Sequence, residues 1–176
     1  MNINEDMNEI RINYIKISFS SSFPCLKFIE KYFVKKRCIY VGDIFFNNTN
    51  YKCSLMRNLS FVNFTGIKSS DEIKLLTNYY CKLSHTILKS KVKVDSIFST
   101  VKNVDINVKN FDKIYKYMKY NDGNIKMYPV FSGIKFKFNH IPGCGIYFKQ
   151  SKKINMCGQK HLNHIVRFLN MFSLIE

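Results

Sequence analysis

The segment FSGIKFKF, residues 131–138, alternates between apolar side chains and lysines. Successive side chains of a β-strand point to opposite faces of the sheet, so Ile134, Phe136 and Phe138 are expected on one face and the two lysines on the other. The first face can pack in a core, and the second can contact negative charge. Because the neighbouring segments predict amphipathic helices, we expect helices over the apolar face and a basic face that no helix covers.

Strand-like runs of this kind begin at two places in the chain. One begins at Tyr40 and ends in a Gly-x-Lys element at residues 66–68, and the other begins at Phe131 and ends in a Gly-x-Lys element at residues 158–160. The two starts are 91 residues apart and the two glycines are 92 residues apart. Order and spacing are both kept, which predicts a duplicated module.

Residues 10–90 and 91–176 are therefore expected to be two repeats of this module. In the first repeat, the pattern predicts strands at residues 11–19, 37–47, 51–57 and 60–66, with helices at 22–33 and after Ser69 or Ser70. In the second repeat, it predicts strands near 92–102, 126–139, 144–149 and 153–158, with helices near 108–119 and from 159 onward.

The composition limits the class of partner. The 176 residues include 28 Lys and Arg against 12 Asp and Glu, a net charge of +16, and 46% are hydrophobic. The apolar fraction supports a core in one domain or two small halves. The charge is distributed along the chain, which favours a polyanion as partner, with nucleic acid first and an anionic membrane second.

Cysteine usage and hydropathy indicate the compartment. The six cysteines are scattered without CxxC pairs, which predicts reduced thiols in a cytosolic or nuclear protein. No run of 18 apolar residues occurs and the start of the chain is polar and acidic. We therefore expect a soluble protein that is not exported.

The second repeat carries the most specific pattern. Residues 131–134, FSGI, open a strand, and Phe148 follows Phe131 by 17 residues. A Ser-Lys-Lys turn lies at residues 151–153, and Cys-Gly-Gln-Lys ends the last strand at residues 157–160. In these segments, and more loosely over nearly the whole chain, the sequence resembles the TATA-box-binding protein family.

The resemblance implies an α+β fold in which two repeats form a curved, antiparallel ten-stranded saddle with the helices on its convex face. It also implies that paired Phe residues, here Phe131 and Phe148, wedge between base steps of an AT-rich minor groove. Lysines at the margin of the sheet then hold phosphates. The basic residues expected to contact DNA are Lys135, Lys137, Lys153 and Lys160.

The first repeat departs from the family pattern. Tyr40 and Arg57 stand where the resemblance places the wedges, and a guanidinium cannot unstack bases as a Phe does, although it can enter a narrow minor groove. We therefore expect a weaker bend at this end. The strand end keeps Thr65 and Lys68 as expected DNA contacts, and Cys157 takes the position of Thr65 in the second repeat.

Polar residues occupy positions at which the family is usually apolar. Asn63 and Asn155 can hydrogen-bond the A N3 and T O2 acceptors of the minor groove, or only weaken the apolar contact. Asn13 matches the central Asn of the family's first strand. Its counterpart in the second repeat is Ser96 or Asp95, so the expected central pair is incomplete.

We found no recognisable catalytic constellation. Cys157, His161 and His164 form a C-x₃-H-x₂-H pattern that lacks the paired spacing of zinc fingers. Single modules of the same fold can accompany DNA glycosylases, but the acidic residues here are sparse and dispersed. We expect neither an enzyme nor a cofactor.

These features predict a general transcription initiation factor that binds and bends AT-rich, TATA-like promoter DNA through the minor groove and nucleates the polymerase pre-initiation complex. The resemblance implies double-stranded promoter DNA, a B-class initiation factor and RNA polymerase as partners, with no membrane partner and a monomer on DNA. The expected location is the nucleus, or the viral factory of a large DNA virus. The alternative is a sequence-indifferent basic DNA- or RNA-binding or packaging protein on the same scaffold.

Overall fold

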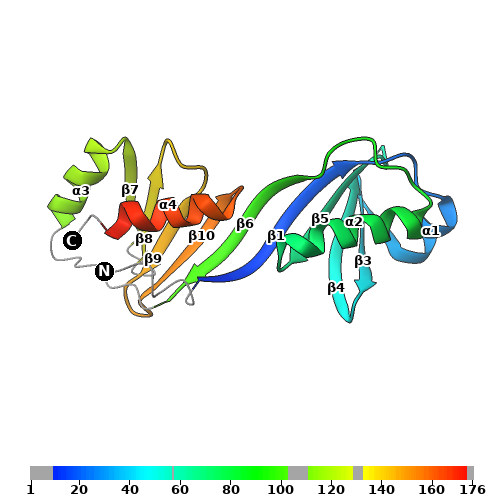
Figure 1. Cartoon of the computed structure of the whole chain (residues 1–176), viewed down its shortest axis with the longest axis horizontal. Coiled ribbons are helices and arrows are strands. Elements are labelled where there is room, and N and C mark those ends of the chain that lie inside the picture. The colour runs from blue at the N-terminus through cyan, green and yellow to red at the C-terminus, as the bar shows by residue number, and fades with distance from the viewer. Residues whose placement is uncertain (1–9, 57, 103–110, 129–132, 174–176) are drawn as a thin grey trace. The chain divides into compact units, whose positions relative to one another are not determined.

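The computed structural model describes residues 10–56, 58–102, 111–128 and 133–173, which form an α+β fold (Figure 1). In chain order its elements are β1 (Ile10–Ser20), α1 (Leu26–Tyr32), β2 (Phe33–Lys36), β3 (Ile39–Phe46), β4 (Thr49–Met56), β5 (Phe61–Ile67), α2 (Ser70–Ser84), β6 (Lys93–Val101), α3 (Phe111–Tyr120), β7 (Gly123–Tyr128), β8 (Gly133–Phe138), β9 (Cys144–Phe148), β10 (Lys153–Gln159) and α4 (Leu162–Ser173). The ten strands form one antiparallel sheet in the order β2-β3-β4-β5-β1-β6-β10-β9-β8-β7. This confirms the α+β class and the ten-stranded sheet. In the described part of the chain, no helix has the length and apolar character needed to span a membrane.

The chain divides into two compact units. The N-terminal unit is Tyr14–Asp95, and the C-terminal unit is Met1–Asn13 together with Ser96–Glu176. The division falls within β1 and β6, whereas the sequence pattern placed the boundary between residues 90 and 91. The strand orders are β2-β3-β4-β5-β1 and β7-β8-β9-β10-β6, so each half of the chain has the same order of strands and of helices.

Two strands differ from the sequence expectation. Strand β2 begins at Phe33, the last residue of the expected first helix, because the backbone is already extended there; the pattern predicted no element at residues 34–36. Only Phe33 of this strand is buried, so the strand has no alternation that could reveal it. The single strand expected over residues 126–139 is instead β7 and β8, and residues 129–132 lie outside the described part.

The core of the N-terminal unit is aromatic. Phe19 of β1 and Phe64 of β5 stack with ring centroids 6.2 Å apart, and Tyr80 of α2 meets each of them edge-on at 5.7 and 5.5 Å. Phe28 of α1 contacts the same tyrosine at 5.6 Å. Both helices therefore pack on one face of this half of the sheet. Such edge-to-face pairs add to the stabilisation that burial alone provides.

The same helix α2 begins with a cap that its sequence predicts. Ser69 is the N-cap, its hydroxyl accepts a hydrogen bond from the backbone N–H of Glu72, and Asp71 and Glu72 stand in the first turn. Negative charge in the first turn interacts favourably with the helix dipole. The expected cap, Ser69 or Ser70, is thus resolved as Ser69.

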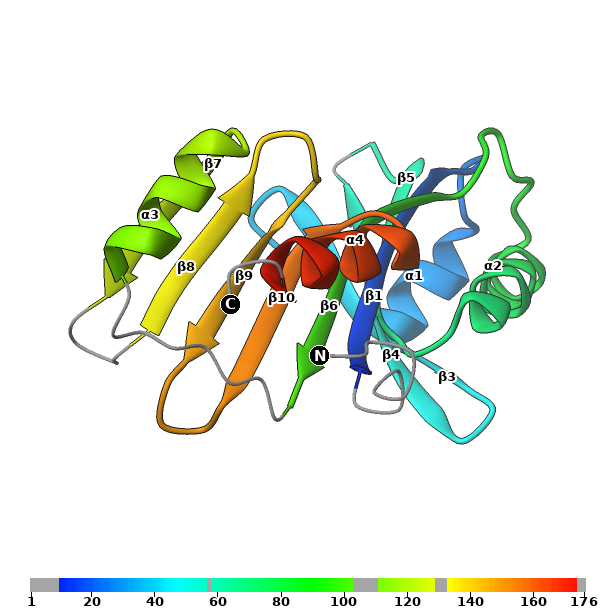
Figure 2. The same cartoon turned by 60° about the vertical axis from the view of Figure 1, so that its left-hand side comes forward.

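In the C-terminal unit, the apolar side chains of β8 are buried as the alternation predicted. Ile134, Phe136 and Phe138 are at most 3% exposed. Phe138 meets Phe168 of α4 edge-on, with centroids 5.3 Å apart. Figure 2 shows α3 and α4 on the same face of strands β7–β10. The helices therefore cover the apolar face of these strands.

A bulge explains the Gly-x-Lys element in each half. The pairing of β1 with β5 jumps from Ile17↔Phe64 to Ile15↔Ile67, around Gly66 with φ +100°. In β6 and β10 the pairing jumps in the same way around Gly158, with φ +83°. Glycine is suited to this backbone conformation because it has no Cβ. The equivalent bulges also give a fixed point from which the registers of the two halves can be compared.

We predict that Gly145→Ala destabilises the C-terminal unit. A Cβ at Gly145 would lie 2.8 Å from the ring of Phe168, which is fully buried. Overpacking of this kind costs about 1–3 kcal/mol. Urea unfolding followed by circular dichroism measures the loss. Phe168→Leu supplies the control, because it makes room for the added methyl group: the double variant should lose less stability than the sum of the single variants, and additive losses would contradict the predicted clash.

Candidate nucleic-acid interface

One face of strands β7–β10 carries the side chains that alternate with the buried ones. One row of opposed residues crosses these four strands. From β7 to β10 it consists of Lys126, Lys135, Ile146 and Asn155. None of these four side chains is buried. We call this surface the basic face, and its members are Asn124, Lys126, Tyr128, Lys135, Lys137, Cys144, Ile146, Phe148, Lys153, Asn155 and Cys157.

The basic face holds positive charges in positions that repel each other. Lys126 and Lys135 are directly opposed on neighbouring strands, and Lys137 follows on the same side of β8. Like charges at opposed positions destabilise a sheet. No carboxylate pairs with these three lysines in the part of the chain that the structure describes, and the Nζ of Lys126 instead lies 5.3 Å from the ring centroid of Tyr128. An anion bound here would relieve the repulsion.

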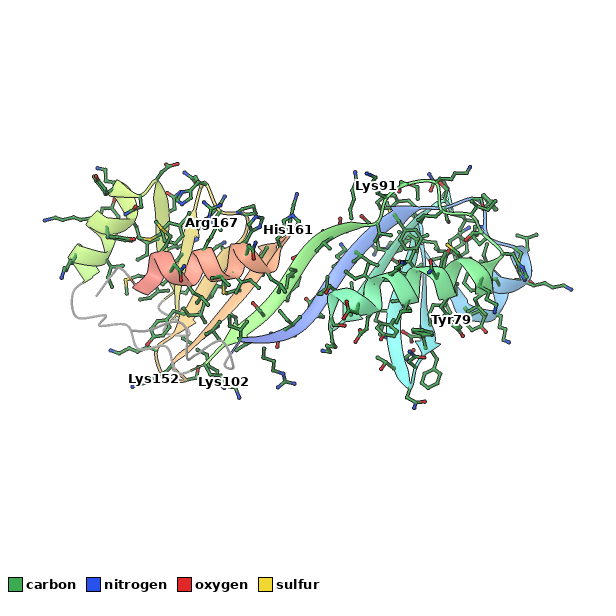
Figure 3. The ribbon with its side chains drawn as sticks, viewed as in Figure 1. Tyr79, Lys91, Lys102, Lys152, His161 and Arg167 are labelled. Carbon is green, nitrogen blue, oxygen red and sulfur yellow. The ribbon has the colours of Figure 1, made fainter. Side chains whose placement is uncertain are left out.

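Further cations stand at one end of this surface. Lys153 begins β10 and lies opposite Phe148, and β6 ends beside it because Val101 pairs with Ile154. The exposed Lys102 and Lys152 extend from these neighbouring strand ends (Figure 3). Phe148 is the last residue of β9, so its aromatic side chain lies among these cationic strand ends.

The structure brings several of the expected DNA contacts together on the basic face. Six expected contacts belong to this face, and each is at least partly exposed: Lys135, Lys137, Phe148, Lys153, Asn155 and Cys157. Lys160 is exposed just after β10, and Lys68 is exposed after β5. The expected wedge Phe131 and the first-repeat residue Arg57 lie outside the described residues.

A chain of polar side chains borders the basic face. The Nδ2 of Asn13 donates to the Oγ1 of Thr100 at 2.8 Å, and this hydroxyl donates to the Oδ1 of Asn155 at 3.0 Å. The exposed Asn155 therefore accepts with its oxygen and directs its amide hydrogens elsewhere. Thr100 links the two expected asparagines, although nothing in its sequence context distinguished it. Only the pairing of β6 with β10 places it there.

The counterpart of Asn13 is Asp95. Ile15 and Ile97 occupy equivalent positions beside the two bulges, so Asn13 and Asp95, two residues earlier, are equivalent as well. The hydroxyl of Ser18 donates to Asp95 Oδ1 at 2.9 Å, which parallels the bond between Asn13 and Thr100. The N-terminal unit thus has a carboxylate where the C-terminal unit has an amide.

Ser96, the other candidate for this position, has a structural role. Its hydroxyl accepts a hydrogen bond from the backbone N–H of Gly158 at 3.0 Å and thereby supports the bulge.

The corresponding face of the N-terminal unit is more apolar and less charged. Lys52 and Asp43, which are opposed on β4 and β3, form an ion pair at 2.9 Å. Asn63 lies between Ser18 and Ser54, and Thr65 lies opposite Lys52, so both expected contacts are on this face. Its exposed apolar side chains are Val34, Phe45, Met56 and Phe61.

Tyr40 lies on the other face of the N-terminal unit from the one expected. It is paired with Leu55, which is fully buried, and so belongs to the face that the helices cover. Counting from the bulges, the position equivalent to Phe148 is Met56, which is 44% exposed. Counted through the same pairings, Tyr40 is equivalent to Ile134 and not to Phe131. Ile134 follows Phe131 by three residues, and an odd displacement along a strand puts a side chain on the opposite face.

The pairings give the difference in hairpin length. Counted from the bulges, the pair Gly42↔Cys53 is equivalent to the pair Phe136↔Gly145. The first pair encloses two more residues of chain than the second. In the β3–β4 hairpin, a tight turn at Asn47 and Asn48 has positive φ at both residues, as a type I′ turn requires.

Neither a protein-family model nor a curated protein matches the chain.

Two cysteines of the basic face are in contact. The sulfurs of Cys144 and Cys157 are 3.4 Å apart, on opposed residues of β9 and β10. A hydrogen bond from the Cys157 thiol, with the nearby charges of Lys135 and Lys137, lowers the pKa of Cys144 to about 6. The same pairing raises the pKa of Cys157, because its proton is held by the Cys144 thiolate. The contact thus favours the thiolate at Cys144 and the protonated thiol at Cys157.

We predict that Cys144 is alkylated with a pH profile centred near 6. Iodoacetamide reacts with the thiolate, so the rate should rise through this pH, below the ordinary cysteine value of 9.0. Peptide mass spectrometry after timed labelling gives the rate at each cysteine. Cys157→Ala removes the donor and should move the profile upward, while Cys25, which is exposed, serves as an internal reference. A wild-type profile at the ordinary cysteine value would contradict the assignment.

Proposed function

We propose that this protein is a TATA-box-binding-protein-like initiation factor, whose two repeats form a saddle that binds and bends AT-rich promoter DNA through the minor groove. The observation that carries the proposal is the basic face. There, lysines that form no ion pair among the described residues share one surface with a partly exposed Phe and an outward-facing Asn, and none of the described helices covers it. The identical strand order in the two halves supports a saddle built from a duplicated module.

Each group on this face has a role in the proposed complex. Lys135, Lys137 and Lys153 attract the phosphates and set the register on the duplex. Phe148 enters between base pairs at the end of the site, where partial unstacking costs a few kcal/mol per step and opens the groove to the sheet. The amide hydrogens of Asn155 pair with A N3 or T O2, the acceptors that an A·T pair presents there.

The proposed partners follow from the family resemblance. They are double-stranded promoter DNA, a B-class initiation factor and, through it, RNA polymerase. The protein acts as a monomer on DNA, in a nucleus or in a viral factory, and has no catalytic role.

A second candidate is a sequence-indifferent nucleic-acid-binding or packaging protein. The observation in its favour is the difference between the units: Met56 stands where the C-terminal unit has Phe148, and Asp43 and Asp95 bring negative charge to the N-terminal side. A protein that binds phosphates with one basic face and does not kink the duplex would have these properties.

Bending of a short duplex separates the two candidates. The wild-type protein should bring together dyes at the ends of a duplex that contains TATAAA, and should do so less with a GC-rich duplex at the same salt concentration. Phe148→Ala should abolish most of the bend and weaken binding roughly tenfold, since an aromatic–base contact is worth about 1–3 kcal/mol. Energy transfer between the dyes measures both effects.

The matched control for this experiment is Tyr120→Ala. Tyr120 is 90% exposed at the end of α3, so its removal takes away an aromatic ring that is not on the basic face. Equal affinity for both duplexes without bending would favour the packaging protein. A normal bend with Phe148→Ala would show that the wedge is assigned to the wrong residue.

Lys137→Gln tests the phosphate contacts. Each lost phosphate contact lowers the slope of log K against log salt concentration by about 1, so this variant should bind DNA less tightly and with a shallower slope. Titrations at several salt concentrations, read by fluorescence anisotropy, give the slope. Lys119→Gln is the control, because this lysine is exposed on α3 of the same unit. A slope that changes equally in both variants would indicate only a general charge effect.

A further inference from the structure

The two cysteines of the basic face have the geometry of a disulfide that has not yet formed. Cys144 and Cys157 are directly opposed on antiparallel strands, with their sulfurs 3.4 Å apart. Opposed residues on such strands have Cα atoms about 4.5–5.5 Å apart, which lies within the range that disulfides span. A bond requires the sulfurs to approach to about 2.05 Å, which is a small movement of two side chains.

Glycines keep the two strands close at this point. Gly143 and Gly145 flank one cysteine, and Gly158 follows the other. A Cβ added at Gly158 would lie 3.0 Å from the Cα of Gly143, and one added at Gly143 would lie 2.4 Å from the carbonyl oxygen of Cys157. The absence of side chains here therefore allows the close backbone approach that brings the thiols into contact.

The pair is also accessible and reactive. Both cysteines are partly exposed, whereas Cys53 is buried and burial raises the pKa of its thiol. Lys135 and Lys137 stand on the same face and favour a thiolate at Cys144. A thiolate with a second thiol in contact is the arrangement in which thiol–disulfide exchange goes on to an internal disulfide.

We propose that Cys144 and Cys157 form a redox-active dithiol that low-molecular-weight disulfides, such as oxidised glutathione, convert to a cross-strand disulfide. The Cys144 thiolate attacks one sulfur of the small disulfide, which gives a mixed disulfide and releases one small thiolate. Cys157 then loses its proton to solvent and attacks the Cys144 sulfur, which releases the second small thiolate. The protein loses two electrons, and the small disulfide gains them.

Oxidation also changes the charge of the basic face. A thiolate at Cys144 places one negative charge on the face that carries Lys135 and Lys137, and the disulfide carries none. The oxidised protein should therefore bind DNA more tightly, and this part of the proposal rests on the proposed function.

The test uses the full chain with Cys25→Ser and Cys38→Ser, which removes two exposed thiols. After incubation with oxidised glutathione at pH 7.5, the protein should lose two free thiols, and the peptides that contain residues 144 and 157 should be found linked. Cys157→Ser should stop at the mixed disulfide, with one glutathione retained on Cys144. A stable glutathione adduct on the parent protein without the internal link, or loss of thiols no faster than at Cys81, would overturn the proposal.

Binding of the TATAAA duplex is then compared between the oxidised and reduced forms. The oxidised form should bind severalfold more tightly, and the difference should vanish with Cys144→Ser. Equal affinities of the two forms would overturn the effect of oxidation on binding. Failure of both forms to bind any duplex would instead overturn the proposed function and leave the disulfide chemistry intact.

Discussion

The strands of the C-terminal unit have to form two different surfaces with alternate side chains of one backbone. In β8 every second residue is an aromatic or branched side chain that packs beneath the helices, and the residues between them are lysines. The burial of Ile134, Phe136 and Phe138 therefore places Lys135 and Lys137 on the opposite face. The repulsion between Lys135 and Lys126 is tolerated because the apolar contacts on the other face determine the register. The stability of the core thus holds the charges in a repulsive arrangement that an anion can relieve.

The sequence predicted the features that arise from local pattern. These features are the period of two in β8, the Ser69 cap and the amphipathic helices, and each depends on residues that are close together in the sequence. The structure confirms the burial of the alternate residues of β8 and the cap at Ser69. The short edge strand β2 was missed, because FVKK buries only its first residue and so lacks a period. The position of Tyr40 was missed because spacing along the chain does not reveal the pairing register, which makes Tyr40 equivalent to the buried Ile134 and not to Phe131.

Contacts between distant segments were the least predictable part of the candidate site. Thr100 lies between Asn13 and Asn155 only because β6 pairs with β10, and its own sequence context is that of an ordinary strand residue. The contact between Cys144 and Cys157 likewise depends on the register of β9 against β10. The spacing of these two cysteines along the chain matched no motif that would have predicted the contact. The expectation of reduced thiols is compatible with this contact, because the sulfurs are close but not bonded.

The greater length of the β3–β4 hairpin shows which changes such a sheet can accept. An insertion of one residue in one strand of a hairpin shifts its pairing by one position and exchanges every inward side chain beyond that point with an outward one. A difference of two residues adds one residue to each strand and preserves parity. Gly42 and Phe136 can then be equivalent and stay on the covered side although the loops beyond them differ. Natural length variation in these hairpins should consequently occur in even steps, and an odd step should be found only together with a new bulge.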